Sequence, residues 1–199
     1  MRYAGSLSWQ VRLSYPPALM INGLFARDAA GLAVAMSFPP PPLDPSVPIE
    51  PRLRDLGTDL AAADWPLWWE AEIDEGAQPS HVRPHASASR TLIGPDLRTL
   101  LDESAHQAAA WSTRHEAEHN RRIRHLPPTD RHATGDLVRS IGADLGRPVE
   151  PFELQVDVLP VQGRWSHRAR HAHLQVSEGL YRDAPAYRDA LEPVIRSLA

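Results

Sequence analysis

His115, Glu116 and His119 stand in the order H-E-x-x-H, and His125 follows ten positions after His115. In a helix, residues four positions apart lie on the same face, so His115 and His119 can bind one Zn²⁺ together. His125 would add a third nitrogen ligand, and Glu116 would polarise a metal-bound water. The spacing therefore predicts a zinc-dependent hydrolase as one candidate function, with Glu116 as its catalytic residue.

This spacing resembles the metzincin zinc-peptidase signature H-E-x-x-H-x-x-G-x-x-H. The resemblance covers eleven residues and implies a zinc ion held by the three histidines, with the glutamate acting on water. The chain departs from the family at Arg122, which stands where the family has glycine, and no methionine follows Met36 to form the family's Met-turn. Arginine is strained in the left-handed conformation that glycine adopts readily. No cofactor is therefore favoured, and zinc is kept as the alternative.

A second candidate site is the cationic segment 164–171, which contains no acidic residue. Arginines beside an aromatic ring are suited to grip phosphates and single-stranded nucleic acids. The net charge of −4 argues against broad affinity for nucleic acids, although not against a local basic patch. A solvated hairpin tip or a docking loop for an acidic protein would explain the same residues. The residues that would bind a polyanion are Arg164, Trp165, Arg168 and Arg170.

Residues 39–51 are rich in proline and predict an extended, polyproline-like connector. Such a segment makes no internal backbone hydrogen bonds, so either its own domain or a neighbouring chain must hold it. Its aliphatic side chains would be the anchors. Neighbouring tryptophans on a helix diverge by about 100°, so part of the tryptophan cluster that follows must reach a second surface. The residues expected to contact a protein partner are Leu43, Val47, Ile49, Trp68 and Trp69.

The composition excludes several kinds of site. All 21 basic residues are arginine, and the chain has no lysine and no cysteine. A P-loop lysine, a Schiff-base lysine, a thiolate nucleophile, a cysteine zinc finger and a disulfide are therefore ruled out. The eleven glycines form neither a dinucleotide fingerprint nor a nucleophile elbow. Heavy use of Ala, Arg and Pro without Lys favours a bacterial origin.

Alternating apolar and polar residues predict four strands, at about 6–15, 32–38, 152–160 and 170–177. The turn signals Pro16-Pro17 and Asn22-Gly23 lie between the first two of these segments. We therefore expect two antiparallel pairs, 6–15 with 32–38 and 152–160 with 170–177.

Apolar residues at helical spacing predict a longest helix from about Pro95 to Arg124 and a last helix over 185–198. The predicted fold is α+β, with helices packed on one side of the strand pairs. The length of 199 residues suits a single domain, 1–199, that contains the connector 39–51.

His171 and His173 share the polar face of the last predicted strand. If the hairpin brings Asp157 opposite His173, these side chains form a His-x-His plus carboxylate set that can hold a divalent metal. The alternative is a solvated sheet face on which His173 and Asp157 pair electrostatically.

The leading hypothesis is a non-catalytic protein that binds protein within an assembly, either a different partner or further copies of itself. Enzymes usually show a denser set of convergent polar motifs than this chain does. The zinc hydrolase and the nucleic-acid-binding accessory protein are the alternatives. No signal-peptide pattern and no run of about 18 apolar residues is found, so we expect a cytoplasmic protein that does not enter a membrane.

Overall fold

The computed structural model describes residues 2–5, 9–77, 91–124 and 133–199. The protein belongs to the α+β class, as predicted. Its internal contacts gather in two compact units, which are described separately below. Unit 1 combines Met1–Tyr15 with Arg121–Ala199, and unit 2 spans Pro16–Asn120.

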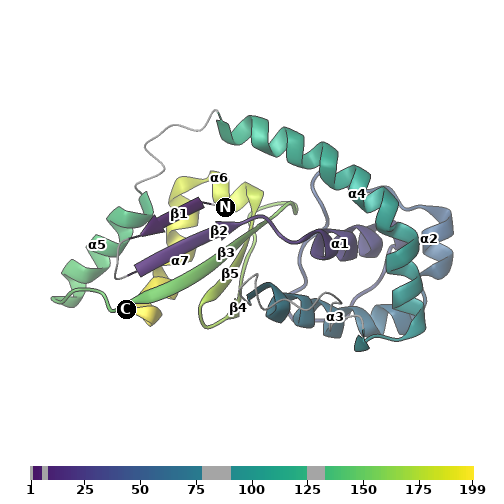
Figure 1. The fold of residues 1–199 in the computed structure, drawn as a ribbon, viewed down its shortest axis with the longest axis horizontal. Coiled ribbons are helices and arrows are strands. Elements are labelled where there is room, and N and C mark those ends of the chain that lie inside the picture. Colours follow the sequence, from purple (N-terminus) through teal and green to yellow (C-terminus); the bar gives the residue numbers. More distant parts are fainter. Residues whose placement is uncertain (1, 6–8, 78–90, 125–132) are drawn as a thin grey trace. The chain divides into compact units, whose positions relative to one another are not determined.

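Unit 1 contains a five-stranded mixed sheet in the order β1-β2-β3-β5-β4 (Figure 1). The three central strands run parallel, and β1 and β4 are antiparallel to their neighbours. Strands from the N-terminal and the C-terminal parts of the sequence therefore form one sheet. The strands are β1 (Arg2–Gly5), β2 (Trp9–Ser14), β3 (Phe152–Leu159), β4 (Ser166–Arg170) and β5 (His173–Ser177).

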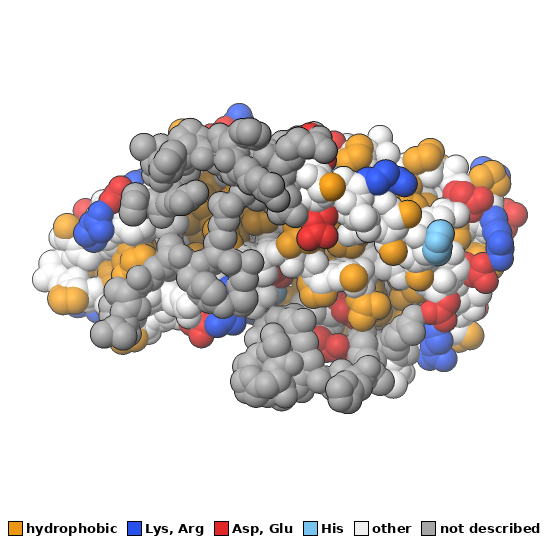
Figure 2. Space-filling view, turned by 45° about the horizontal axis from the view of Figure 1, so that its top comes forward, with side chains coloured by type: hydrophobic (Ala, Val, Ile, Leu, Met, Phe, Trp, Pro, Cys, Tyr) orange, Lys and Arg blue, Asp and Glu red, His pale blue; other side chains and the backbone are white. Residues whose placement is uncertain are grey.

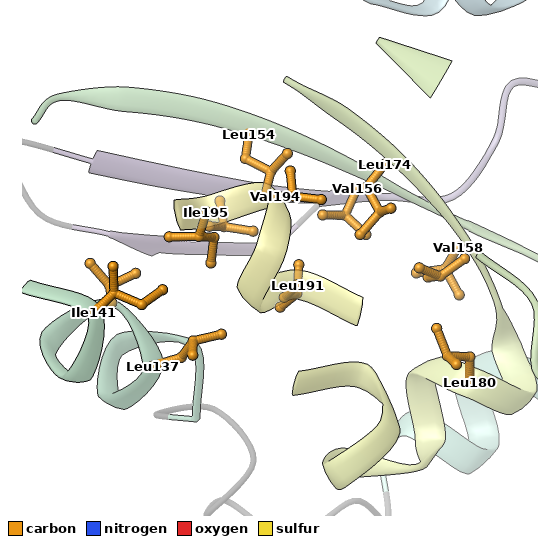
Figure 3. Packing of buried hydrophobic residues seen from close by; sticks show 13 residues of the cluster. Leu137, Ile141, Leu154, Val156, Val158, Leu174, Leu180, Leu191, Val194 and Ile195 are labelled. Carbon is orange, nitrogen blue, oxygen red and sulfur yellow. The ribbon is translucent and has the colours of Figure 1, made fainter. Parts of the chain in front are cut away.

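Three helices cover one face of this sheet: α5 (Ala133–Leu145), α6 (Glu178–Arg182) and α7 (Ala184–Leu198). Their apolar stripes pack on the alternating apolar residues of β3 and β5, as Figure 3 shows. Because side chains alternate along a strand, the polar residues of β3 and β5 lie on the opposite face. The apolar cluster includes Leu137, Ile141, Leu154, Val156, Leu174, Val176, Leu191, Val194 and Ile195.

The predicted antiparallel pairing of 152–160 with 170–177 is wrong. β3 and β5 are parallel neighbours, and Asp157 lies opposite Gln175 in their register. The chain reaches this arrangement because Ser166–Arg170, expected as part of a loop, forms β4 and pairs antiparallel with β5. A short edge strand that carries charged side chains is protected from further pairing, but its sequence looks like that of a loop.

The predicted strand at 32–38, and with it the antiparallel pair 6–15/32–38, is also wrong. Within 6–15 the structure has β2, whose strand partners are β1 and β3. The turn signal Asn22-Gly23 lies inside helix α1 (Ala18–Ala30), because the side chain of Asn22 finds buried hydrogen-bond partners on a neighbouring helix. Gly31, with a φ of 67°, then ends the helix in the left-handed conformation.

Unit 2 consists of α1, α2 (Pro51–Leu56), α3 (Asp59–Ala77) and most of α4 (Pro95–Arg124). The predicted long helix is confirmed as α4. Three tryptophans of α3 are buried. The rings of Trp65 and Trp69 stack with their centroids 5.2 Å apart. Trp68 packs so closely on Gly23 of α1 that a Cβ atom at this glycine would lie 2.0 Å from the indole ring.

The proline-rich connector is held by α1 of the same unit. Arg27 is buried and donates hydrogen bonds to the backbone oxygens of Pro40, at 2.6 Å, and Pro41, at 2.8 Å. Asp28 accepts a hydrogen bond from the backbone N–H of Leu43 at 2.7 Å, and its other carboxylate oxygen pairs with Arg27. The Arg27–Asp28 ion pair of α1 therefore holds the first half of the connector, and a backbone hydrogen bond from Glu50 to Ala29 holds its end.

Replacing Arg27 by Met is expected to loosen this connector. The two proline carbonyls would lose their donors, and Asp28 would lose the partner that orients it toward Leu43. Backbone hydrogen exchange at Leu43 should become about tenfold faster or more. Hydrogen-exchange NMR measures this rate. Arg52→Met is the control, because that arginine pairs with Glu103 on the exposed surface and should leave Leu43 unchanged. An unchanged rate in Arg27→Met would contradict this role of Arg27.

Candidate functional site

The predicted zinc ligands lie on α4 and beyond its end. The helical conformation expected for this motif is confirmed. The ring of His115 is buried and lies flat on Trp111, with 4.9 Å between the centroids and 2° between the planes. Glu116 is exposed to solvent, whereas a residue that activates a metal-bound water has to face the metal. The side chain of His119 and the whole of His125 lie outside the described residues.

The His-x-His pair is divided between two environments. His171 lies in the turn before β5, where its Nδ1 is 3.1 Å from the guanidinium of Arg168. His173 is buried and pairs with Asp157. In the part of the chain that the structure describes, no three His, Asp or Glu side chains are grouped so that they could hold a metal ion. The zinc site therefore stays a prediction without support from these side chains.

The arginines of the cationic segment make several contacts within unit 1. Arg164 pairs with Asp183, which caps α7, at 2.5 Å. Arg168 donates to the turn before β5 and to a serine of α7, and Arg170 donates to the carbonyl of its own neighbour. Trp165 and Arg170 are half-buried. These contacts give the three guanidinium groups a role in the fold, and polyanion binding stays a prediction.

The residues predicted to bind a partner separate into two groups. Leu43, Trp68 and Trp69 are fully buried in unit 2, so they offer no surface to another molecule in this conformation. Val47 is half-buried, and the side chain of Ile49 is 57% exposed. Of the residues expected to contact a partner, only Val47 and Ile49, in the second half of the connector, therefore remain accessible.

Val47 and Ile49 lie on the wall of a groove of about 490 Å³. Helices α1 and α4 form the other walls, and most of the lining side chains are apolar. His106 and Arg114 bring positive or titratable groups to the α4 side. The described residues that line the groove are Phe25, Ala29, Val47, Pro48, Ile49, Glu50, Pro51, His106, Gln107, Ala110, Trp111 and Arg114.

Helix α3 presents a second apolar surface, away from its buried tryptophans. Leu60 is 68% exposed and Leu67 is 63% exposed. They are seven positions apart and therefore lie on one face of the helix, with exposed Ala63 between them. Asp59 is exposed at the start of the same helix. Apolar side chains remain visible between charged ones on the molecular surface (Figure 2).

A buried polar cluster lies on the sheet of unit 1, on the face opposite to α5 and α7. Asp157 of β3 is its centre. Its Oδ2 is 2.8 Å from Nε2 of His173, and its Oδ1 accepts hydrogen bonds from Ser14 at 2.5 Å and from Gln155 at 3.0 Å. Both His173 and Asp157 are about 2% exposed. This is a buried charged group whose oxygens are well supplied with donors.

The strand register explains how the cluster is assembled. Ser14 on β2, Asp157 on β3, Gln175 on β5 and His167 on β4 lie opposite one another in one row across four strands. The row lies near the carboxyl ends of the parallel strands β2, β3 and β5. Open sheets commonly bind ligands at this end of parallel strands.

The charge state of Asp157 follows from its partners. Burial raises the pKa of this carboxyl group, but the hydrogen bond and charge of His173, with the hydrogen bonds of Ser14 and Gln155, outweigh burial and lower the pKa below its ordinary value. Asp157 is therefore ionised at neutral pH and can only accept. His173 must donate to it from Nε2–H.

This arrangement differs from that of a nucleophilic triad. Ser14 donates its proton to Asp157, so the hydroxyl is not activated by His173. The aspartate fixes the orientation of His173 and keeps a hydrogen on Nε2, so that Nδ1 is the ring nitrogen left for another partner. When the ring is neutral, Nδ1 can accept a hydrogen bond.

The pairing of Asp157 with His173 was one of two sequence-based interpretations, and it is found between parallel strands, not in a hairpin. The solvated sheet face that this interpretation assumed is wrong, because these side chains are buried. Ser14 and Gln175 were not singled out. In the sequence, these two residues only stand at polar positions of alternating strands. Such positions do not show whether the polar face of the sheet is buried or exposed to solvent.

None of the helices in the described segments is long and apolar enough to cross a membrane. No family model matches the chain, and neither a curated protein nor a solved structure matches it.

Proposed function

We propose that the protein works by binding protein, and that its copies associate with one another through unit 2. The observation that carries this proposal is the apolar groove beside Ile49. A side chain that is 57% exposed on the wall of a groove gains most from a partner that removes it from water. Grooves of this kind are a common way to recognise an apolar helix face.

The outer face of α3 has the features that such a groove requires. Leu60 and Leu67 are spaced as anchors of an amphipathic helix, and both are more than half exposed. None of the described lining residues of the groove belongs to α3. The helix of one copy can therefore enter the groove of the next copy while its own groove stays available.

Charge favours the same pairing. Arg114 is exposed at the rim of the groove and makes no ion pair with any described residue. Asp59, at the start of α3, is exposed and acidic. An acidic helix end next to an arginine rim raises the rate of association and selects the orientation, although it adds little affinity by itself.

Two different surfaces on each copy give a heterologous contact, which forms rings or open chains. We therefore expect a molecular mass that rises with concentration. The test uses two single variants, Ile49→Arg in the groove and Leu67→Arg on α3. Light scattering should find each variant monomeric when it is alone. An equimolar mixture should form a one-to-one dimer, because one copy keeps its groove and the other keeps its α3 face.

Leu92→Arg is the matched control, since Leu92 belongs to unit 2, is 64% exposed and lies on neither surface. It should associate like the unchanged protein. A monomeric unchanged protein over roughly a hundredfold range of concentration would refute self-association. Two variants that stay monomeric when mixed would instead refute the head-to-tail arrangement.

A further inference from the structure

The buried sheet face of unit 1 contains hydrogen-bonding atoms that the fold does not use. His173 and Gln175 are neighbours on the same face of β5, 2% and 0% exposed. Among the residues that the structure describes, Nδ1 of His173 has no hydrogen-bond partner, and neither the oxygen nor the nitrogen of the Gln175 carboxamide has one. Buried side-chain polar atoms are mostly satisfied in folded proteins, so three unpaired atoms at one place need an explanation.

Other polar side chains on the same sheet face do have hydrogen-bond partners. Asp157, Ser14 and Gln155 lie on the same face and are joined by hydrogen bonds of 2.5 to 3.0 Å. A buried carboxamide without partners destabilises the folded state, and an apolar side chain of the same size would avoid that cost. Groups that are kept at the expense of stability commonly serve binding or catalysis.

We infer that His173 and Gln175 bind a small, neutral ligand that carries an amide-type edge, with an N–H donor beside a carbonyl acceptor. The carboxamide of Gln175 offers one acceptor and two N–H donors, and it can therefore pair with such an edge through two parallel hydrogen bonds. A further N–H or O–H of the ligand would donate to Nδ1 of His173.

The spacing and charge of the site restrict the ligand further. Residues two apart on a strand are about 6.6–6.8 Å apart along the chain, so a ligand the size of one ring or one peptide group can bridge them. When the His173 ring is neutral, the ionised Asp157 next to it disfavours an anion. A carboxylate ligand, moreover, has no hydrogen to donate to Nδ1. The edge that fits is found in nucleobases such as uracil and in small amides such as acetamide.

The first test measures thermal stability and needs no ligand. Gln175→Met removes the unpaired carboxamide and keeps the length of the side chain. Because the unpaired carboxamide destabilises the folded state, we expect the melting temperature of this variant to rise by about 3 °C or more. Gln155→Met is the matched control on the neighbouring strand, because that amide donates to Asp157, and its melting temperature should fall. A fall in Gln175→Met would overturn the inference, since the carboxamide would then support the fold.

The second test titrates the full ¹⁵N-labelled chain with uracil, acetamide and acetate while the His173 ring nitrogens and the Gln175 side-chain amide are observed by NMR. We expect new resonances for both groups with at least one of the two amide probes, in slow exchange because the site is buried, and no change with acetate. Binding of uracil alone would identify a nucleobase site, and binding of both probes a general amide site. Gln175→Met should abolish the response. If neither amide probe changes these resonances, or if acetate changes them, the inference is wrong.

Discussion

Alanine at position 23 is expected to destabilise unit 2 by about 3 kcal/mol or more, although glycine to alanine normally favours a helix. A Cβ at Gly23 would lie 2.0 Å from two ring carbons of Trp68. The ring cannot move away easily, because Trp68 is buried and is packed against Trp65 and Trp69. The backbone is also constrained, since the oxygen of Gly23 accepts a hydrogen bond from the Trp65 indole at 3.0 Å.

Urea denaturation followed by tryptophan fluorescence measures this effect. Four of the six tryptophans belong to unit 2, namely Trp65, Trp68, Trp69 and Trp111, so the signal reports mainly on that unit. Gly135→Ala on α5 of unit 1, followed by far-ultraviolet circular dichroism, is the control for a helical glycine, because the nearest atoms to its new Cβ are 3.8 and 4.0 Å away. The control should be neutral or more stable by about 0.5–1 kcal/mol. A cost below about 1 kcal/mol at Gly23 would show that the packing around Trp68 is wrong.

The same contact explains why the tryptophan cluster was only partly understood from sequence. Trp68 and Trp69 do diverge on α3, as their adjacent positions require, and a second surface does receive one of them. That surface belongs to the same unit. The ring of Trp68 packs directly against Gly23 of α1, while Trp69 stacks on Trp65. The sequence identified Gly23 as a turn signal, because glycine marks a turn and a close helix contact equally well.

Local signals predicted α4 from end to end, since Pro95 starts the helix and a long apolar stripe continues it. The sheet was harder to predict because pairing partners and direction depend on the whole fold. Alternation in β3 and β5 located both strands approximately, but it could not show that β4 pairs with β5 and leaves β3 parallel to it. The groove beside Ile49 and the Gln175 site depend on packing between distant segments, which no local pattern records.

Replacing Asp157 by Asn is expected to destabilise unit 1 by about 3 kcal/mol at neutral pH, because His173 and Ser14 would lose a buried charged acceptor. The unfavourable effect of burial on the carboxylate is already outweighed in the native cluster by its donors, chiefly His173, so its pKa is lowered in the folded state. The folded protein therefore binds fewer protons at Asp157 than the unfolded chain. This contribution is fully present above the unfolded pKa of about 3.9 and is lost as the pH falls through the lower folded value.

The difference between the unchanged protein and Asp157→Asn should consequently be present at about pH 5 and shrink below about pH 4. Melting temperatures or urea midpoints over this range measure it. Glu153→Gln provides the control on the same strand, because Glu153 forms a largely exposed pair with Arg12, and its loss should cost less than about 1 kcal/mol at every pH. A difference for Asp157→Asn that is equally large in acid would mean that lost packing, and not the lost charge, carries the effect. The carboxylate would then not be the group that fixes His173.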